Sequence, residues 1–192
     1  SLDPKNVRIP GILVDAVVVH PGQMQTIEGE YDPALTGDVR MLVESMVPMP
    51  LDQRKVVARR AAMELSKGSV INLGFGMPDG VARVAAEEGI EGYVKMTIEQ
   101  GIIGGVPAGV AYNSESMIDG PSQFDFYSGG GLDMTCLGLA QADSHGNVNV
   151  SRFGPTIAGC GGFIDISQTA KKCVFCGAFT AGGLKTEIKD GK

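Results

Sequence analysis

The sequence lacks any block of Lys and Arg residues and any long apolar run. It carries 16 basic and 22 acidic residues, for a formal charge of -6. Binding to a nucleic-acid backbone needs a clustered basic footprint, so nucleic acid is not expected as a partner, although a single bound nucleotide stays compatible. The most apolar early stretch, residues 11–19, is short and contains Asp15. We therefore expect no signal peptide, no membrane span and a cytoplasmic protein.

Cysteine and histidine are also scarce, with four and two residues. Cys173 and Cys176 have C-x-x-C spacing, but they fall in an expected buried strand, where side chains alternate between faces and these two thiols diverge. We expect no metal site and interpret all four cysteines as free buried thiols. His145 is interpreted as a solvated hairpin-turn residue, and His20 is given no role.

Length and composition predict one domain with a sizeable core. The chain has 192 residues, of which 43% are hydrophobic, so a single α/β or α+β domain is expected. Its 28 glycines are about twice the usual share and are spread through apolar stretches. This distribution indicates tight turns and close backbone approaches, which are common in small-molecule sites.

The first 47 residues differ from the rest of the chain. Four prolines punctuate them, and residues 12–19 are the one good strand candidate. We interpret residues 1–47 as an extended arm or interdomain connector and residues 48–192 as the main α/β domain. A helix is expected over residues 51–65, with Val56 and Met63 on its apolar face and its end at Gly68.

After this helix, strands and helices alternate. Strands are expected at residues 69–73, 94–99, 134–138 and 173–179, and a helix at 79–88. This order predicts an α/β fold with an open, largely parallel sheet and flanking helices. Because ligands bind beyond the carboxyl ends of strands in such sheets, the turns after the first two strands are the places where chemistry is expected.

The first of these turns is GFGMPDG at residues 74–80, directly before the expected helix. Asp79 is placed to cap that helix. The segment is either a simple tight turn or a site where phosphate and amide groups of a ligand approach backbone N–H donors at a helix N-terminus. A pantetheine nucleotide such as coenzyme A fits the second interpretation.

The second turn places Glu99 at the end of an apolar strand, followed by the glycine-rich segment 101–107. Glu99 is either a surface or capping residue without a role, or a carboxylate nucleophile. A glutamate has an ordinary pKa of about 4.3, so it is ionised near neutral pH and needs no partner base to attack a thioester. Such a reaction needs N–H donors for the oxyanion, and the glycine cluster GCGG at residues 159–162 offers them, although spacing alone does not bring it to Glu99.

Read together, four motifs resemble the second half of a family I CoA-transferase, the group that contains succinyl-CoA:3-oxoacid and acetate or propionate CoA-transferases. They are GFGMP at 74–78, EQG at 99–101, GGGLDMTCLG at 129–138 and GGFID at 161–165. Their order and spacing match over residues 69–180. The resemblance implies the fold that CoA-transferases share with sugar-phosphate isomerases.

The resemblance also implies a mechanism and its residues. Glu99 becomes a glutamyl-CoA thioester in a ping-pong cycle between an acyl-CoA and a carboxylic acid, and the backbone N–H of Gly162 binds the thioester oxygen. Coenzyme A is a substrate and covalent intermediate, and no metal or tightly bound cofactor is implied. The residues assigned to the CoA site are Gly74, Phe75, Gly76, Met77 and Gly161.

Two departures from the family pattern shape the expectation. Most members have Ser-Glu-Asn-Gly around the nucleophile, whereas this chain has IEQG at residues 98–101, which resembles the acetate or propionate branch acting on short-chain acyl-CoAs. The chain also lacks the N-terminal half that supplies further substrate contacts, and it stops before the further elements of the family. We therefore expect a fragment whose partner is that half, and an enzyme that forms a homo-oligomer.

Two alternatives remain at this stage. A non-catalytic sugar-phosphate-sensing domain of related fold would have no covalent chemistry at Glu99. A sugar-phosphate isomerase would need an acid/base pair, and the sequence offers no convincing partner for Glu99.

Overall fold

The computed structural model describes residues 2–22, 31–42, 45–108, 110–178 and 189, and it divides the chain into two compact units, Ser1–Asp32 and Pro33–Lys192. In the first unit, the only regular elements among the described residues are the short 3₁₀ helices η1 (Pro4–Asn6) and η2 (Gly11–Leu13). The strand expected at residues 12–19 is wrong. Ile12 and Val18 are 93% and 86% exposed, and a strand requires a neighbour to pair with its backbone groups.

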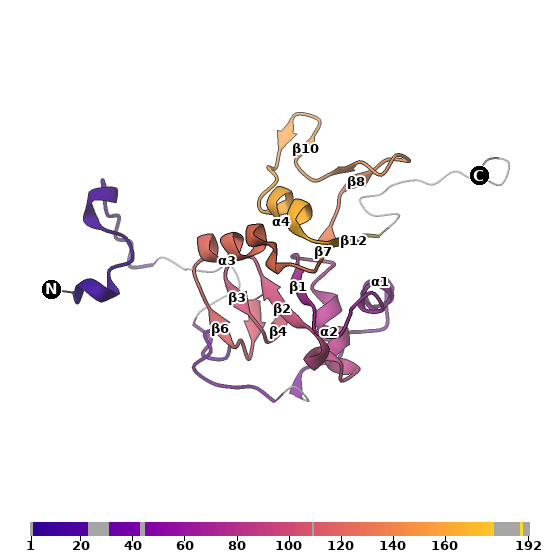
Figure 1. Ribbon diagram of the computed structural model, residues 1–192, viewed down its shortest axis with the longest axis horizontal. Helices are drawn as coiled ribbons and strands as arrows, with labels where there is room; N and C mark the ends of the chain where they lie inside the picture. Colours follow the sequence, from indigo (N-terminus) through magenta and orange to yellow (C-terminus); the bar gives the residue numbers. More distant parts are fainter. Residues whose placement is uncertain (1, 23–30, 43–44, 109, 179–188, 190–192) are drawn as a thin grey trace. The chain divides into compact units, whose positions relative to one another are not determined.

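The second unit contains a six-stranded sheet (Figure 1) in the order β12-β7-β1-β2-β3-β6. β12, β7, β1 and β2 run parallel, while β3 and β6 add an antiparallel edge. The strands are β1 (Val70–Leu73), β2 (Lys95–Ile98), β3 (Ile102–Ile103), β6 (Ser116–Met117), β7 (Met134–Gly138) and β12 (Lys172–Cys176). The expected open, largely parallel α/β sheet is confirmed.

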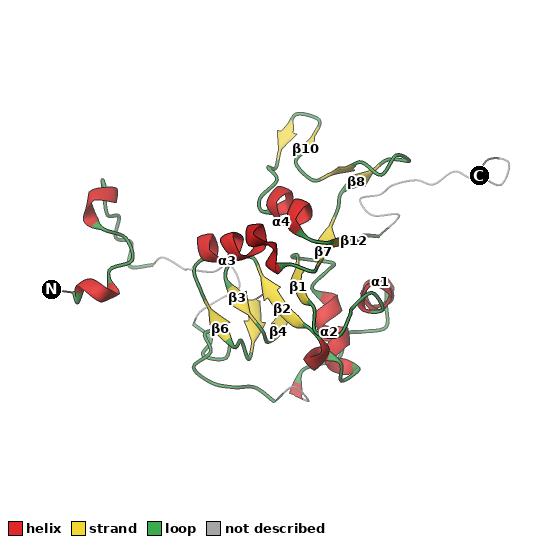
Figure 2. Cartoon of the chain, viewed as in Figure 1, coloured by secondary structure: helices red, strands yellow, loops and turns green. Residues whose placement is uncertain are grey.

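Helices cover both faces of this sheet, and three short hairpins complete the described part of the unit (Figure 2). The helical segments are α1 (Gln53–Ala62), α2 (Gly80–Glu87), η4 (Glu91–Tyr93), α3 (Gly120–Phe126), its π-helical continuation η5 (Tyr127–Gly131), and α4 (Phe163–Thr169). The hairpins are β4–β5 (Val106–Ala108, Val110–Tyr112), β8–β9 (Gln141–Ala142, Val148–Asn149) and β10–β11 (Arg152–Phe153, Thr156–Ile157).

The alternation of side chains along the strands builds two cores. On one face, Ile71, Met96 and Cys136 pack with α1 and α2. On the other face, Leu137 packs with α4 and with Tyr127 at the end of α3. The same alternation turns the polar residues at positions 72, 97 and 135 toward the α3 side of the sheet.

Helix α1 differs from its prediction in its length and in its buried face. It ends at Ala62 and not near Gly68. Val56 and Met63 are 60% and 78% exposed, and the buried residues are Ala58, Ala61 and Ala62. The reason is the close approach of α1 and α2: a Cβ on Gly80 would lie 3.0 Å from the Ala58 Cβ, so only small residues fit between the helices.

The caps of α1 and α2 also differ. The Asp52 side chain accepts a hydrogen bond from the Lys55 N–H at the start of α1. Asp79 stands at the start of α2 but makes no capping hydrogen bond, so that expectation is wrong. Its φ and ψ of −53° and −34° are already helical, whereas a capping side chain is usually presented from extended backbone.

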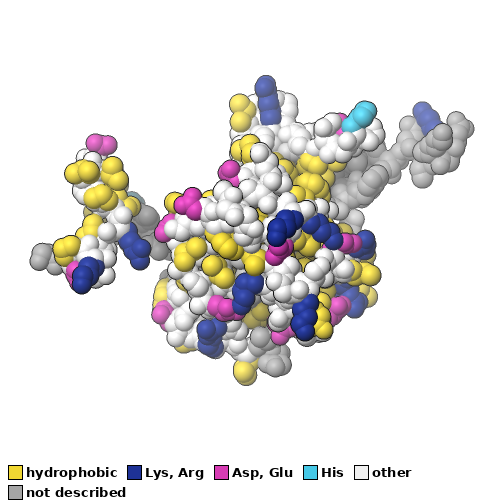
Figure 3. All heavy atoms as spheres, viewed as in Figure 1, with side chains coloured by type: hydrophobic (Ala, Val, Ile, Leu, Met, Phe, Trp, Pro, Cys, Tyr) yellow, Lys and Arg dark blue, Asp and Glu magenta, His cyan; other side chains and the backbone are white. Residues whose placement is uncertain are grey.

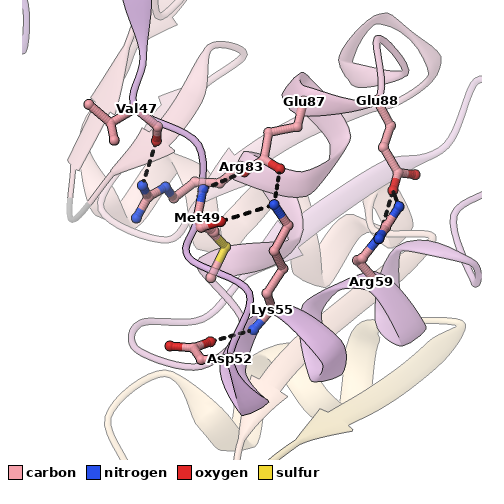
Figure 4. A network of polar contacts seen from close by, with 8 residues as sticks. All are labelled: Val47, Met49, Asp52, Lys55, Arg59, Arg83, Glu87 and Glu88. Atoms are coloured by element: carbon pink, nitrogen blue, oxygen red, sulfur yellow. Dashed lines mark hydrogen bonds and ion pairs between the residues drawn. The ribbon is translucent and has the colours of Figure 1, made fainter.

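Two basic side chains of α1 are paired with acids at the end of α2 (Figure 4). Lys55 binds Glu87, and Arg59 binds Glu88. Glu87 also accepts from the Met49 N–H, which ties the segment before α1 to α2. Over the visible face of the second unit, Lys and Arg lie interspersed with Asp and Glu (Figure 3), in agreement with a solvated surface.

A third acidic residue, Glu64, is expected to make the stability of the fold depend on pH. Lys172 and Arg60 both bind Glu64 and lower its pKa from 4.5 to about 2. A carboxyl with a lowered folded pKa adds stability above its unfolded pKa, and this contribution disappears as the pH falls from 4.5 toward 2. Urea unfolding between pH 2 and 6 should therefore show a smaller acid loss in Glu64→Gln than in wild type. Equal slopes in wild type and Glu64→Gln would rule this pairing out.

Candidate active site

Glu99 follows directly after β2, and its side chain is half-buried. The Gly101 N–H closes the turn by donating to the Ile98 carbonyl at 3.0 Å. Burial raises the pKa of the Glu99 carboxyl above its ordinary value, while the nearby Asn72 amide and the Glu99 backbone N–H act in the opposite direction. The carboxylate therefore lies at the carboxyl ends of the adjacent strands β1 and β2, in a setting that makes it more basic than a solvated glutamate.

A buried polar network lies beside Glu99. The Asn72 amide donates to the Tyr127 hydroxyl at 3.2 Å and accepts from the Thr135 hydroxyl at 3.0 Å. The Thr97 hydroxyl donates to the Ile71 carbonyl at 2.8 Å and lies 2.7 Å from the Tyr127 hydroxyl. These groups come from three neighbouring strands and from the helix that covers them, so the sheet and α3 together define the surroundings of the carboxylate.

Burial and the charge of Glu99 both affect the pKa of the Tyr127 hydroxyl. Its pKa is raised, mainly by burial and also by the negative charge of Glu99, against the hydrogen bonds from its polar neighbours. One of those neighbours is Gln123, whose side chain is 0% exposed. The Gln123 amide lies close enough to lower the Tyr127 pKa, yet neither of its polar atoms makes a hydrogen bond of normal geometry with a described residue.

The turn after Glu99 depends on a glycine. Gly101 has a φ of +110°, and a Cβ placed on it would lie 1.9 Å from the Ile118 carbonyl oxygen. Both the backbone conformation and the space therefore exclude a side chain. The chain can turn sharply here and leave β2 with the Glu99 side chain at the end of the strand.

The first glycine turn ends β1 at the same edge of the sheet. The Gly74 N–H donates to the Cys136 carbonyl at 2.9 Å, which holds the turn against β7. Phe75 is 79% exposed, and Arg54 donates to the Gly76 carbonyl at 3.3 Å. Met77 is partly buried against the core shared with α1 and α2. Because β1 and β2 are parallel neighbours, this turn and Glu99 occupy adjacent strand ends.

The second glycine cluster precedes α4. Gly161 and Gly162 lie at the start of this helix, and a Cβ on Gly162 would lie 2.7 Å from the Phe124 ring. Phe124 belongs to α3 and packs edge-on against the Tyr127 ring at 6.0 Å. The structure therefore brings the cluster to the helix that covers the Glu99 network, a proximity that sequence spacing did not reveal.

The residues that sequence reasoning missed are those of the polar network beside Glu99. Asn72 and Thr97 each interrupt an apolar strand, and this interruption was the available signal. The further members sit on other elements, so no local pattern could join them to Glu99. They are Gln123, Tyr127 and Thr135.

Cys173 and Cys176 diverge as the sequence predicted, but the expectation that all four cysteines are buried is wrong for Cys160 and Cys173, which are only partly buried. The Cys173 thiol donates to the Ser167 carbonyl at 3.3 Å on the α4 side, whereas Cys176 is buried in the opposite core. The neighbouring Cys176 thiol, together with burial, raises the pKa of Cys136. His145 is 83% exposed in the turn between β8 and β9. Among the described residues, no cluster of His, Cys, Asp and Glu is arranged to hold a metal ion.

Comparison with known proteins points to a single chemistry. The chain is 50% identical to acetate CoA-transferase YdiF of Escherichia coli K12 over 100% of the chain and 37% of that protein. It is 48% identical to caffeate CoA-transferase of Acetobacterium woodii, over 100% of the chain and 39% of the relative. It is also 31% identical to the acetate CoA-transferase subunit beta of Escherichia coli K12, over 65% of the chain and 63% of that subunit. No family model matches the chain.

Solved structures agree with these relatives. Acyl-CoA transferase YdiF of Escherichia coli O157:H7 matches as the apoenzyme with a TM-score of 0.79 and 51% identity, over 100% of the chain and 36% of that protein. Its thioester complex with CoA matches with a TM-score of 0.77 and 50% identity over the same shares. The chain thus spans well under half the length of the full-length relatives that it matches.

The fold and the sequence similarity place the chain among the family I CoA-transferases, as a segment that resembles their beta subunit. Within that family, the acetate CoA-transferase branch fits the matches. No helix among the described residues is long and apolar enough to cross a membrane.

Proposed function

We propose that Glu99 is the nucleophile of an enzyme that moves coenzyme A from a short-chain acyl-CoA to a second carboxylic acid. The observation that carries this proposal is the setting of Glu99. Its carboxylate is half-buried near the Asn72 amide at the end of a parallel strand, beside a glycine turn. The chain around it is matched over its whole length by an acetate CoA-transferase.

The cycle begins when a Glu99 carboxylate oxygen attacks the carbonyl carbon of the acyl-CoA thioester. The C–S bond breaks, the CoA thiolate leaves, and a mixed acyl-glutamyl anhydride remains. The thiolate then attacks the glutamyl carbonyl, which releases the first carboxylate and leaves Glu99 as a CoA thioester. A second carboxylate enters and the same steps run in reverse, so that Glu99 is regenerated and no redox or metal step is required.

Several backbone groups are assigned to support this cycle. The Gly162 N–H is the proposed donor to the oxygen that becomes negatively charged at each attack. Gly161 and the turn formed by Gly74, Phe75, Gly76 and Met77 are the proposed CoA site. The support is their placement: the first turn lies at the strand end next to Glu99, and the second cluster lies against α3.

The remaining features of the enzyme are proposed from the extent of the matches. The chain covers 37% of acetate CoA-transferase YdiF. We assign residues 48–192 to a catalytic α/β domain, residues 1–47 to a connector, and the missing substrate contacts to an N-terminal CoA-transferase half. The complete enzyme is proposed to be a cytoplasmic homo-oligomer. Acetate and related short-chain acids are the proposed carboxylates.

Steady-state kinetics of the complete enzyme test the proposal. With acetyl-CoA or propionyl-CoA as donor and a second carboxylate as acceptor, a covalent enzyme intermediate predicts parallel double-reciprocal lines. With acetyl-CoA alone, the enzyme should release one acetate per active site and retain CoA. Intersecting lines together with no acetate release would show direct transfer and exclude the glutamyl thioester.

A further inference from the structure

The buried network next to Glu99 has only one consistent arrangement of protons. The Thr97 hydroxyl lies 2.8 Å from the Ile71 carbonyl oxygen. Because a carbonyl oxygen can only accept, Thr97 donates its single hydroxyl proton in this hydrogen bond. The 2.7 Å contact between the Thr97 and Tyr127 hydroxyls then needs a proton from Tyr127. Tyr127 therefore donates to Thr97, and its oxygen is left with lone pairs only on the side that faces Asn72.

This arrangement fixes the orientation of the Asn72 amide. A carbonyl oxygen directed at the Tyr127 oxygen would set lone pairs against lone pairs, so the Asn72 NH₂ group must lie there, at 3.2 Å. The Asn72 oxygen consequently faces Thr135, whose hydroxyl donates to it at 3.0 Å. The second N–H of the same NH₂ group is the donor that remains for Glu99.

The strand pairing places this donor beside Glu99. Asn72 is paired with Thr97 across β1 and β2, and Glu99 stands two residues beyond Thr97, so the alternation of side chains puts Asn72 and Glu99 on the same side of the sheet, which α3 covers. A donor at this place agrees with the lowering effect of Asn72 on the Glu99 pKa. All five network side chains, Asn72, Thr97, Gln123, Tyr127 and Thr135, are at most 1% exposed, so bulk water does not compete for these protons.

We propose that Tyr127 is a positioning residue, whose hydroxyl holds the Asn72 amide in the one orientation that presents an N–H to the Glu99 carboxylate. Tyr127 acts through Asn72 and does not itself react. The ionised form of a half-buried nucleophile is thereby kept available and aligned. The role in catalysis rests on the proposed function of Glu99, whereas the orientation of the network rests on the hydrogen bonds alone.

The acidic groups on the helix that covers Glu99 face the solvent. Burial raises the Glu99 pKa, and the Asn72 amide and the Glu99 backbone N–H lower it. On α3, Asp125 is exposed, and Asp119, also exposed, accepts from the Ser122 N–H at the start of the helix. Tyr127 stays neutral because its pKa is raised.

The test is a ¹³C NMR titration of the Glu99 carboxyl in the complete enzyme labelled at the glutamate side-chain carbon. The Glu99 signal is identified by its loss in Glu99→Gln. Tyr127→Phe removes the hydroxyl, and Thr97→Val removes the acceptor so that the Tyr127 proton becomes free to turn toward Asn72. In both variants Asn72 is free to flip, and the Glu99 pKa should rise.

Two further variants separate positioning from packing. Thr97→Ser keeps the hydroxyl and should restore the wild-type Glu99 pKa, while Tyr93→Phe removes a hydroxyl remote from the network and should not shift it. An unchanged Glu99 pKa in both Tyr127→Phe and Thr97→Val would overturn the proposal. So would an equal rise in Thr97→Ser, because only loss of packing would then explain it.

The kinetic consequence is read separately. In Tyr127→Phe, the rate of thioester formation should fall about tenfold to a hundredfold, and this loss should become smaller as the pH is raised. Absence of a thioester in wild type would reject the proposed function of Glu99 and leave the NMR result as the test of the network. A thioester that forms with the same pH profile in wild type and Tyr127→Phe would reject a role for Tyr127.

Discussion

Replacing Glu99 with glutamine is expected to lower CoA-transfer turnover of the complete enzyme by a factor of about a thousand or more. A glutamine side chain cannot supply the carboxylate oxygen that attacks the thioester, and loss of a covalent nucleophile commonly costs several orders of magnitude. The measurement is kcat and kcat/KM with acetyl-CoA as donor. The substitution is nearly isosteric, so packing around the site should be preserved.

The same variant should be more stable than wild type at neutral pH. Burial raises the folded pKa of Glu99 above its ordinary value of 4.5. A carboxyl with a raised folded pKa stabilises the fold in its protonated form, and this stabilisation is lost as the pH rises through the folded pKa. The advantage of Glu99→Gln in thermal unfolding should therefore grow as the pH rises from 4.5 and then level off.

Glu115→Gln is the matched control for both effects. Glu115 is exposed and pairs with Lys95 at the surface, and it is outside the proposed machinery. It should retain turnover and show no such stability gain. Equal losses of turnover in both variants would contradict the assignment of Glu99.

Gly101→Ala is expected to destabilise the fold by at least about 3 kcal/mol. A Cβ at this position would lie 1.9 Å from the Ile118 carbonyl oxygen, and the φ of +110° disfavours any side chain. The added Cβ would collide with a backbone atom and not with a flexible side chain, so the turn after Glu99 would have to move. Urea unfolding gives the free-energy difference, and turnover should fall with it.

Gly129→Ala serves as the control for a glycine without such constraints. A Cβ there would meet no atom within 4 Å, and its φ is not positive. Its unfolding midpoint should stay close to that of wild type. A Gly101→Ala variant as stable as Gly129→Ala would show that the turn is not built as described.

Much of the sheet could be predicted because its signals are local. The strand at 134–138 coincides with β7, and the strands at 69–73 and 94–99 contain β1 and β2. Each is a short apolar run bounded by turn residues. Residues 12–19 carry the same apolar signal, but pairing with a neighbour is a non-local event that the sequence of one segment does not report.

Helix α1 shows a second limit of pattern reading. Large apolar side chains at 56 and 63 suggested the buried face, but the close approach to Gly80 selects alanines instead. The distance between two helices is a property of the packed pair, and it decides whether large or small residues are buried.

The candidate site, like the fold, could be predicted only in part from the sequence. Glu99 could be singled out because a carboxylate at the end of an apolar strand is unusual. Tyr127 could not, because it lies on a helix 28 positions later and meets Asn72 and Thr97 only when α3 covers the sheet. The direction of the Tyr127 hydrogen bonds depends on all of its partners together, so it can be determined only from the three-dimensional structure.

Peptide mapping of the covalent intermediate tests the central claim most directly. The complete enzyme is incubated with acetyl-CoA without acceptor, quenched and digested, and the CoA adduct is located by mass spectrometry. We predict a hydroxylamine-sensitive CoA thioester on Glu99 in wild type and in Glu115→Gln, and none in Glu99→Gln. An adduct on another residue, or one that persists in Glu99→Gln, would contradict the assignment.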